Sequence, residues 1–219
     1  MMWNQTLHET VTGPPLTLTA DLLIGAGGHK KVYVHPQDES LCVKVLHYGA
    51  EDKDWQKELR YRRSREKRSL TSTLLTEYYG ACPLTGGGIG YVFERIRDFD
   101  GHDSLTFQDH IDRLRSLPQI DRNAVIAGMV TFRYFLFREK IITSNMEPGN
   151  FCVQLVSADS YRLRIVDNIG SPVFILLLFY VDTLALHHVN RYWQRFVSDL
   201  HREYPWLIDD SIAAILYGP

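Results

Sequence analysis

The sequence predicts an α+β protein in two parts, a β-rich first part followed by a helical second part. Two observations predict this order. Short segments of alternating apolar and polar residues, separated by turns, dominate the first 96 residues. Longer segments with apolar residues at helical spacing dominate residues 97–219. A strand-rich part followed by a helix-rich part is typical of α+β folds with a cleft between them.

The first part is expected to hold five strands and one helix, preceded by an irregular arm over residues 1–15 that ends in Gly-Pro-Pro. The helix, over residues 54–70, falls between the third and fourth strands. A turn of three glycines, residues 86–88, joins the last two strands. The strands are expected over residues 16–25, 30–36, 41–47, 74–83 and 90–96.

The second part begins with a predicted helix over residues 121–140, which carries a broad apolar face. A loop, "TSNMEPGNF" (143–151), follows directly. Residues 151–156 and 161–166 then form a predicted hairpin around the turn "SADS". The tail is expected to be mostly helical.

Composition excludes some classes of function. The formal charge is −2, so the global basic field of a nucleic-acid-binding protein is absent. Basic residues do gather in the helix, over residues 57–68. They indicate either a solvated helix face or contact with an anionic partner or membrane surface. These basic residues are Arg60, Arg62, Arg63, Arg65, Lys67 and Arg68.

The sequence predicts a cytoplasmic protein without a transmembrane segment. Cys42, Cys82 and Cys152 are few and far apart, which disfavours a disulfide framework or zinc site and fits a reducing cytosol. The N-terminus lacks a basic start followed by an apolar run, so no signal peptide is indicated. The longest apolar run, residues 172–181, is about half the length that spans a bilayer.

Several residues have chemical potential. Gly25, Gly27 and Gly28 stand between two strands, where glycine backbones let a phosphate approach closely, although a simple hairpin turn explains them too. A Rossmann site is disfavoured because a strand follows them. Lys44 lies mid-strand between two valines, so it is either an edge-strand lysine in water or a buried one that needs a partner such as Glu58.

Asn150 and Asp167 flank the predicted hairpin. An amide oxygen and a carboxylate that converge there suit a hard divalent cation such as Mg²⁺, whereas a lone Asp-Asn-Ile-Gly can also be a turn. Taken singly, each of these signals is modest. Their order along the chain is the specific feature.

That order resembles the protein-kinase fold, with a small β-rich N-lobe (residues 1–96) and a reduced helical C-lobe (residues 97–219). More closely, the chain resembles the bacterial YrbL family, kinase-like proteins named within the PhoP regulatory network. The resemblance covers roughly residues 18–200. It is carried by "LIGAGGHKKVYVHP", "CVKVL", "GYVFERIRDFDG" and "VDNIG".

The resemblance implies ATP and Mg²⁺ as cofactors and a role for each position. Gly25 and Gly27, with Gly28 beside them, would cover the phosphates. Lys44 would bind the α- and β-phosphates and pair with Glu58. The remaining implied roles are Phe93 as gatekeeper, the backbones of Glu94 and Ile96 facing adenine, and Asn150 and Asp167 holding Mg²⁺.

The loop departs from the kinase pattern. Asn145 occupies the position of the catalytic aspartate, and Glu147 occupies that of the lysine that faces the γ-phosphate. Asn cannot accept a proton at neutral pH, and loss of a general base typically costs about 10²–10⁴-fold in rate. Glu147 has three readings: a residue of an inactive site that points to solvent, a displaced base, or an extra metal ligand.

Two functions stay open. One is an ATP-dependent phosphotransferase with a modified catalytic loop. Little chain follows Gly170 to grip a peptide, so its unknown acceptor is expected to be a non-protein molecule. The alternative is a pseudokinase that binds nucleotide, or only a partner, and regulates within the PhoP network.

Overall fold

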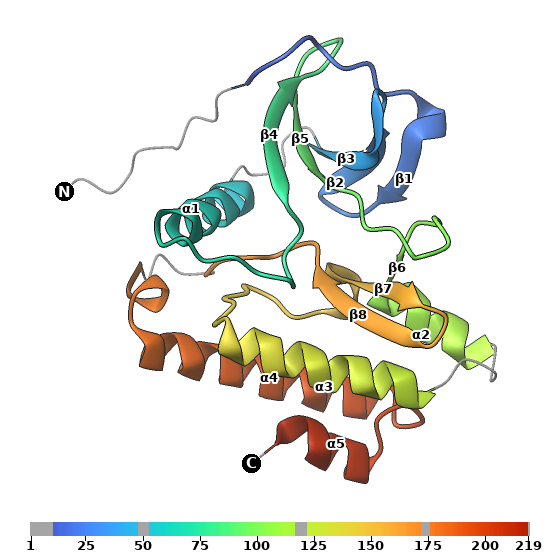
Figure 1. The fold of residues 1–219 in the computed structure, drawn as a ribbon, viewed down its shortest axis with the longest axis vertical. Coiled ribbons are helices and arrows are strands. Elements are labelled where there is room, and N and C mark those ends of the chain that lie inside the picture. Colours follow the sequence, from blue (N-terminus) through green and yellow to red (C-terminus); the bar gives the residue numbers. More distant parts are fainter. Residues whose placement is uncertain (1–10, 48–52, 117–121, 172–175, 219) are drawn as a thin grey trace. The chain divides into compact units, whose positions relative to one another are not determined.

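The computed structural model describes residues 11–47, 53–116, 122–171 and 176–218, and the chain divides into two compact units. The first unit comprises Met1–Gln56 and Thr76–Ile96, and the second comprises Lys57–Leu75 and Arg97–Pro219. Figure 1 shows the order of the elements. The first unit is rich in strands and the second is mainly helical, so the predicted α+β class is confirmed.

The first unit is built on one antiparallel sheet of five strands in the order β1-β2-β3-β5-β4. β3 is therefore a central strand, flanked by β2 and β5. The strands are β1 (Leu23–Ala26), β2 (Lys30–His35), β3 (Asp38–Leu46), β4 (Tyr78–Pro83) and β5 (Ile89–Glu94).

The two faces of this sheet carry different side chains because residues alternate along each strand. Val43 pairs with Val92 and is fully buried, and it packs in a small cluster with Leu16 and Cys82. On the opposite face, Cys42 pairs with Phe93, and Lys44 pairs with Tyr91. The register thus places the candidate lysine on the aromatic face of the sheet.

The expected strand over residues 16–25 is shorter in the structure, and β1 begins only at Leu23. A 3-10 turn, η1 (Ala20–Leu22), interrupts it, with the Leu22 N–H donating to the carbonyl of Thr19. Leu16 instead donates from its backbone N–H to the carbonyl of Pro83 on the edge strand β4. This short stretch therefore covers an edge that would otherwise present unpaired backbone groups.

Residues 1–10 of the expected arm lie outside the described residues. The last part of the arm continues the cover of β4, since the Thr12 N–H donates to the carbonyl of Ala81 at 3.1 Å. The arm is thus joined to the sheet edge from Val11 onward, through a parallel bridge to Ala81.

In the second unit, helices pack around a three-stranded sheet of order β6-β7-β8. α3 approaches β8 closely at Gly128, where a Cβ atom would lie 3.4 Å from Leu163. The helices are α2 (Phe107–Ser116), α3 (Arg122–Arg138), α4 (Asp182–Glu203) and α5 (Asp210–Tyr217), with strands β6 (Leu105–Thr106), β7 (Phe151–Ser157) and β8 (Ser160–Ile165) and 3-10 turns η2 (Pro148–Asn150) and η3 (Leu176–Phe179).

An aromatic core ties α3, β7 and α4 together. The ring of Phe151 lies 5.3 Å from that of Phe132 and 5.4 Å from that of Phe196, at edge-to-face angles that favour such pairs. Trp193 is fully buried, and its indole N–H donates to the carbonyl of Leu216 on α5 at 2.7 Å. The hairpin that lies between the candidate metal ligands therefore packs on helices α3 and α4.

Helix α1 (Lys53–Lys67) belongs to both units, since the division falls between Gln56 and Lys57. The sequence assigns the whole helix to the first part, yet its later turns group with the second unit because Tyr61 is 2% exposed in that unit's core. The helix ends before the expected Leu70, because Ser69 adopts a φ of 52° and the Leu70 N–H donates back to the carbonyl of Arg65.

Across the described residues, no helix combines the length and apolar character needed to cross a bilayer.

Candidate functional site

The candidate catalytic loop, residues 143–151, lies between α3 and β7 in the second unit. The two residues before the loop, Ile141 and Ile142, are each 1% exposed, and Met146 in the middle of the loop is also buried. Asn145 is half-buried and Glu147 is exposed. The fold thus fixes the loop through apolar neighbours, leaves Glu147 exposed and keeps Asn145 partly accessible.

A ladder of backbone hydrogen bonds joins this loop to the segment that carries Asp167. The Ser144 N–H donates to the carbonyl of Asn168 at 2.8 Å, and the Val166 N–H donates to the carbonyl of Asn150 at 3.0 Å. A further bridge pairs Thr143 with Ile169. The loop positions 145 to 150 therefore lie beside Asp167 within one unit.

Asn150 and Asp167 fit a divalent metal by chemistry and by place. Asn150 is 8% exposed, and its Nδ2 has no hydrogen-bond partner among the described residues. The Nδ2 donor is thus not used to hold the fold, and a half-turn of the amide group would present Oδ1 in its place. Asp167 follows β8 and is half-buried. In the described parts of the chain, no group of three or more His, Cys, Asp and Glu is gathered, so phosphate oxygens and water would complete an Mg²⁺ shell.

Helix α1 supports the ladder through Gly170 and Tyr61. Gly170 has a φ of 96°, and a Cβ atom there would lie 3.0 Å from the carbonyl of Lys57. The Tyr61 hydroxyl accepts a hydrogen bond from the Ile142 N–H at 3.0 Å. Sequence reasoning missed Tyr61, since nothing in the helical pattern separates it from a core residue.

Helix α4 supports the same loop through His188, which sequence reasoning also missed. Its Nε2 lies 2.9 Å from the carbonyl of Thr143, and its ring stacks on Tyr192 at 4.3 Å. His188 is 8% exposed, and burial lowers its pKa below the ordinary 6.5. A neutral ring with its proton on Nε2 donates to that carbonyl. In the sequence, the signal that could have identified His188 is the presence of a histidine on the apolar face of the tail helix.

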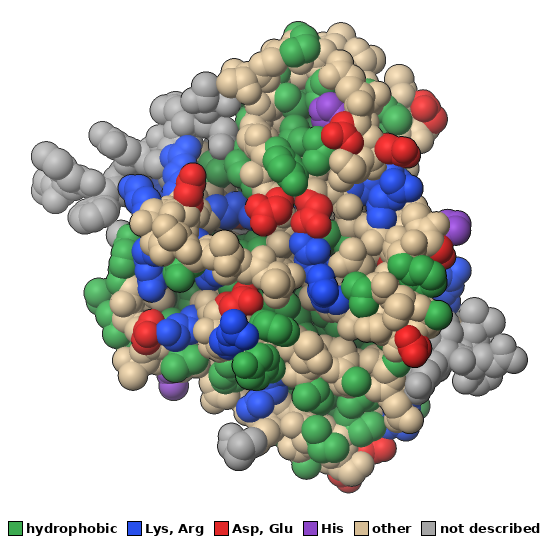
Figure 2. Space-filling model, in the orientation of Figure 1, with side chains coloured by type: hydrophobic (Ala, Val, Ile, Leu, Met, Phe, Trp, Pro, Cys, Tyr) green, Lys and Arg blue, Asp and Glu red, His purple; other side chains and the backbone are tan. Residues whose placement is uncertain are grey.

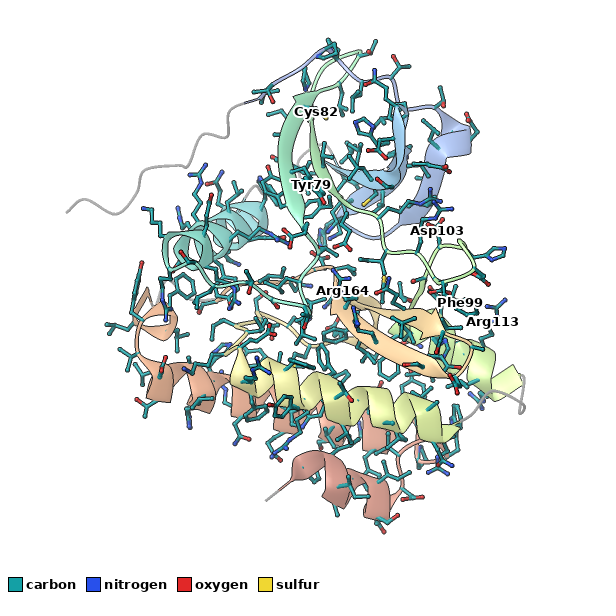
Figure 3. All side chains as sticks on the ribbon, viewed as in Figure 1. Tyr79, Cys82, Phe99, Asp103, Arg113 and Arg164 are labelled. Carbon is teal, nitrogen blue, oxygen red and sulfur yellow. The ribbon has the colours of Figure 1, made fainter. Side chains whose placement is uncertain are left out.

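Arg164 is a third residue that the sequence did not single out. It lies on β8, three positions before Asp167, and is 7% exposed (Figure 3). Its guanidinium donates to the carbonyl of Leu75 at 3.0 Å. This bond holds the strand that leads to Asp167 against the chain that follows α1.

Glu147 presents an available carboxylate. Its backbone carbonyl accepts the Asn150 N–H at 2.9 Å, which closes the turn η2. Within the described residues, its exposed side chain makes no hydrogen bond or ion pair. The geometry is thus compatible with the solvent-facing reading, and it leaves the carboxylate free to meet a metal or an acceptor hydroxyl.

In the first unit, Lys44 is buried on the aromatic face of the sheet. It lies on the central strand β3, is 8% exposed, and its Nζ is 3.9 Å from the centre of the Phe93 ring. The reading of an edge-strand lysine in water is therefore wrong. A lysine in such a place is stabilised by the aromatic ring and is suited to meet an anion.

The fold does not demand glycine at every position of the turn between β1 and β2. The Gly27 N–H donates to the carbonyl of Lys30 at 2.9 Å, which closes the turn. None of Gly25, Gly27 and Gly28 has a positive φ, and a Cβ atom on Gly28 would meet nothing within 4 Å. The open space around Gly28 is what a phosphate approaching the backbone requires.

The expected adenine segment begins at the end of β5. Phe93 is fully buried and contacts Trp55, with ring centres 5.8 Å apart. The Glu94 N–H donates to the carbonyl of Glu77, whereas the Glu94 carbonyl is approached by the weak thiol donor of Cys42 at 3.7 Å. Of these two backbone groups, the carbonyl is thus the one suited to face a base. Ile96, which is 7% exposed, closes the first unit.

Glu58 lies on α1 and is 5% exposed. Its carboxylate accepts a hydrogen bond from Arg62 Nε at 2.8 Å, one turn later on the helix. The expected pair of Glu58 with Lys44 would join the two units and stays a prediction.

Comparison with known proteins gives two kinds of relative. The chain is 28% identical over 177 residues to the uncharacterized protein YrbL of Escherichia coli (strain K12), covering 80% of this chain and 83% of that protein. The YrbL protein of Shigella flexneri matches to the same extent. Among solved structures, a double mutant of the Mycobacterium tuberculosis PknI kinase domain is similar, with 18% identity and a TM-score of 0.45. That match covers 75% of this chain and 62% of the kinase domain.

The model of the family described as PhoP regulatory network protein YrbL matches residues 16–201. This stretch contains every candidate site residue, from Gly25 to Asp167, and both supporting residues of the loop, Tyr61 and His188. The chain belongs to the YrbL family.

Proposed function

We propose that this protein binds ATP and Mg²⁺ and acts as an ATP-dependent phosphotransferase with a modified catalytic loop. The observation that carries the proposal is the backbone ladder of the second unit. It holds the loop of Asn145 and Glu147, the buried amide of Asn150 and the carboxylate of Asp167 next to one another. Phosphoryl transfer depends mainly on such positioning and on charge stabilisation.

The roles follow from chemistry. Lys44 would meet the α- and β-phosphates, with the glycine turn around Gly28 covering them. Asn150 and Asp167 would hold Mg²⁺, which supplies positive charge beside the phosphates when bound. The Glu94 carbonyl would face the base.

The modified loop sets the expected rate. Asn145 can orient an acceptor hydroxyl by a hydrogen bond, but it cannot take the proton. Glu147 is exposed and free of protein partners in the described chain, so its carboxylate can take that proton if the acceptor reaches it. We therefore expect slow turnover. The acceptor is expected to be a small, non-protein molecule, because only 11 residues separate Gly170 from Asp182, where α4 begins, and so short a segment offers little surface to bind a peptide.

A second candidate is a pseudokinase that acts as a regulator in the PhoP network. Asn145 favours it, since the position lacks a general base. The family's description places its members in that network. In this reading the nucleotide, or a partner, changes the conformation and no phosphate is transferred.

ATP hydrolysis or transfer, followed with and without Mg²⁺, separates the two candidates. The phosphotransferase reading expects metal-dependent turnover that is lost in Lys44→Met and Asp167→Ala. The exposed hairpin-turn variant Asp159→Ala serves as a control that stays active. Absence of turnover in the wild type, together with ATP binding, would support the pseudokinase instead.

Two further variants test the loop itself. If Glu147 acts as the base, Glu147→Gln lowers turnover by about 10²-fold or more. Asn145→Asp restores a base, so we expect a large gain in rate if the rest of the site is intact. Unchanged rates in both variants would contradict any role of this loop in proton transfer.

A further inference from the structure

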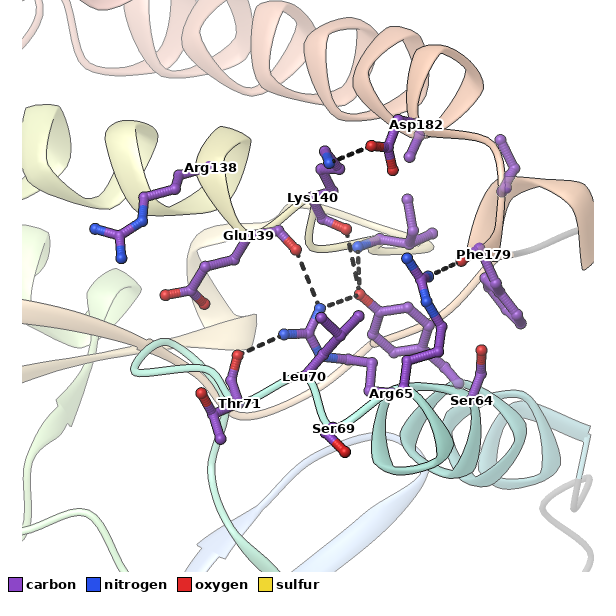
Figure 4. Close-up of a pocket in the computed structure, with 15 residues that line it drawn as sticks. Ser64, Arg65, Ser69, Leu70, Thr71, Arg138, Glu139, Lys140, Phe179 and Asp182 are labelled. Carbon is purple, nitrogen blue, oxygen red and sulfur yellow. Dashed lines mark hydrogen bonds and ion pairs between the residues drawn. The ribbon is translucent and has the colours of Figure 1, made fainter.

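A cavity of about 250 Å³ lies in the second unit, and its lining includes Ile142 but none of the loop residues 143–151. It is lined by the end of α1, the end of α3 and the segment that leads into α4 (Figure 4). Among the residues that line it are Arg65, Arg68, Arg138, Glu139, Lys140 and Asp182. Figure 2 shows Lys and Arg side chains gathered over α1.

The charges of this cavity do not balance. Lys140 Nζ and an Asp182 carboxylate oxygen lie 2.6 Å apart, so these two charges compensate each other. Within the described chain, no carboxylate forms an ion pair with Arg65, Arg68 or Arg138. Three guanidinium groups and Lys140 therefore face two carboxylates, those of Glu139 and Asp182, and the charge of Arg68 also helps to lower the pKa of Asp182.

Arg65 makes this imbalance costly. Its side chain is buried, with the residue 6% exposed, and its guanidinium donates to the carbonyl of Thr71 at 2.8 Å, to that of Glu139 at 3.1 Å and to the Tyr61 hydroxyl at 3.4 Å. All three acceptors are neutral. A buried charge that has only neutral partners is expensive unless an anion compensates it.

Arg68 and Arg138 line the same cavity from opposite elements. Arg68 donates to the carbonyl of Phe179 and lies over the Tyr180 ring. Arg138 lies over the rings of Tyr134 and Phe135. Both arginines are exposed, and these contacts leave N–H groups of each guanidinium available to an anion.

The cavity also offers neutral and acceptor groups. The hydroxyls of Ser64 and Ser69 line it and can donate to an anion. Oε2 of Glu139 is buried without a hydrogen-bond partner among the described residues. A ligand that carries a hydroxyl or a protonated oxygen beside its anionic group would satisfy this oxygen.

We propose that this cavity is a binding site for a phosphate-type anion, held by Arg65, Arg68 and Arg138 and distinct from the nucleotide site. Arginine suits phosphate because its planar fork donates two parallel hydrogen bonds. The Tyr61 hydroxyl, which contacts Arg65 and also accepts the Ile142 N–H, lies between this cavity and the candidate catalytic loop. An anion bound here therefore stabilises the start of that loop.

Two sources could supply the anion. One is a small soluble phosphorylated molecule. The other is a lipid headgroup, because Leu177 and Tyr180 beside the cavity are each 60% exposed and would meet the surface of a bilayer. The chemistry of recognition is the same in both cases, so the experiment has one arm for each source.

The soluble arm titrates inorganic phosphate into the nucleotide-free protein by calorimetry, against chloride at matched ionic strength. The lipid arm measures sedimentation with phosphatidylcholine vesicles that contain phosphatidic acid, against pure phosphatidylcholine. The test variant is Arg68→Gln with Arg138→Gln, which spares the buried Arg65. Arg113→Gln on α2, an exposed arginine outside the cavity (Figure 3), is the matched control.

We expect saturable binding in at least one arm, weakened at least about tenfold in the double variant and unchanged in Arg113→Gln. A nucleotide site can also bind phosphate, so the titration is repeated with Lys44→Met. Binding at this cavity is expected to persist in that variant, whether or not the proposed function is correct. Loss of binding in Lys44→Met, equal loss in Arg113→Gln, or no binding in either arm would overturn the proposal.

Discussion

Individual buried side chains position the candidate loop. Tyr61 on α1 and His188 on α4 each hold one backbone group just before Asn145. Neither residue was expected from the sequence, because a buried tyrosine or histidine in an amphipathic helix has the same pattern whether its polar atom is used or not. The sequence did single out Lys44, since a lysine between two valines in the middle of a predicted strand breaks the pattern of burial.

Tyr61→Phe tests the first of these contacts. The change leaves the Ile142 N–H buried without its acceptor, so we expect a loss of about 1–3 kcal/mol in the free energy of unfolding. Urea unfolding followed by tryptophan fluorescence measures it. Tyr134→Phe is the control, because Tyr134 is 58% exposed and its change should cost less than about 0.5 kcal/mol. Equal costs in the two variants would contradict the role of the hydroxyl.

His188 predicts a dependence of stability on pH. Burial holds its folded pKa below 6.5, so above pH 6.5 both the folded and the unfolded histidine are neutral. As the pH falls below 6.5, the unfolded state takes up a proton that the folded state resists, and stability is lost. His188→Gln keeps a donor without the titration.

Urea midpoints at about pH 7.5 and about pH 5.5 measure this effect. We expect the drop between them to be smaller in His188→Gln than in the wild type. The variant retains part of the drop, because burial also lowers the pKa of His110. An identical drop in both proteins would rule out His188 as a titrating group in this range.

At the scale of elements, strong periodicity made most strands and the helix α3 predictable, with ends within a few residues. The errors have local causes. The first strand was drawn too long because a 3-10 turn at Ala20–Leu22 keeps the alternating pattern, and α1 was drawn too long because the turn at Ser69 has no glycine to mark it. Helix α2 and the short β6 were not predicted, since they are short and their apolar residues are few, whereas α5 lies in the tail that was expected to be mostly helical.

Close packing of the five-stranded sheet is testable at Gly90 on β5. A Cβ atom there would lie 2.5 Å from Val43 Cγ1 and 3.2 Å from Cys82 Sγ, in the small core of the first unit. We expect Gly90→Ala to destabilise the protein by about 1–3 kcal/mol through overpacking. The measurement is denaturant unfolding, and a variant as stable as the wild type would show that the core of the sheet is looser than described.

At Gly28, in the turn between β1 and β2, we expect the opposite of Gly90: a substitution that leaves stability unchanged but weakens ATP binding. Gly28 has open space around its Cα and no positive φ, so Gly28→Ala should leave the melting temperature unchanged. If a phosphate approaches this turn, the added methyl group weakens ATP binding several-fold. Thermal melting and ATP titration of the same variant measure both effects. Full ATP affinity in Gly28→Ala would place the phosphates elsewhere.

At the scale of the whole molecule, the proposed function assigns roles to residues of both units. Asn150 and Asp167 lie in the second unit beside the altered loop and are proposed to bind Mg²⁺, whereas Lys44 and the glycine turn lie in the first unit and are proposed to bind the phosphates. The order of motifs along the chain is the basis of this assignment, which stays a prediction, and the replacement of the usual base by Asn145 makes turnover a separate question from binding. Nucleotide binding is therefore the central claim, and both functional readings that include a nucleotide depend on it.

Thermal melting of the wild type with ATP, ADP and GTP, each with and without Mg²⁺, tests this claim most directly. We expect ATP to raise the melting temperature, more so with Mg²⁺, and we expect Lys44→Met and Asp167→Ala each to abolish the rise although they lie in different units. A rise that is independent of Mg²⁺ and equal in both variants, or no rise with any nucleotide, would contradict the account.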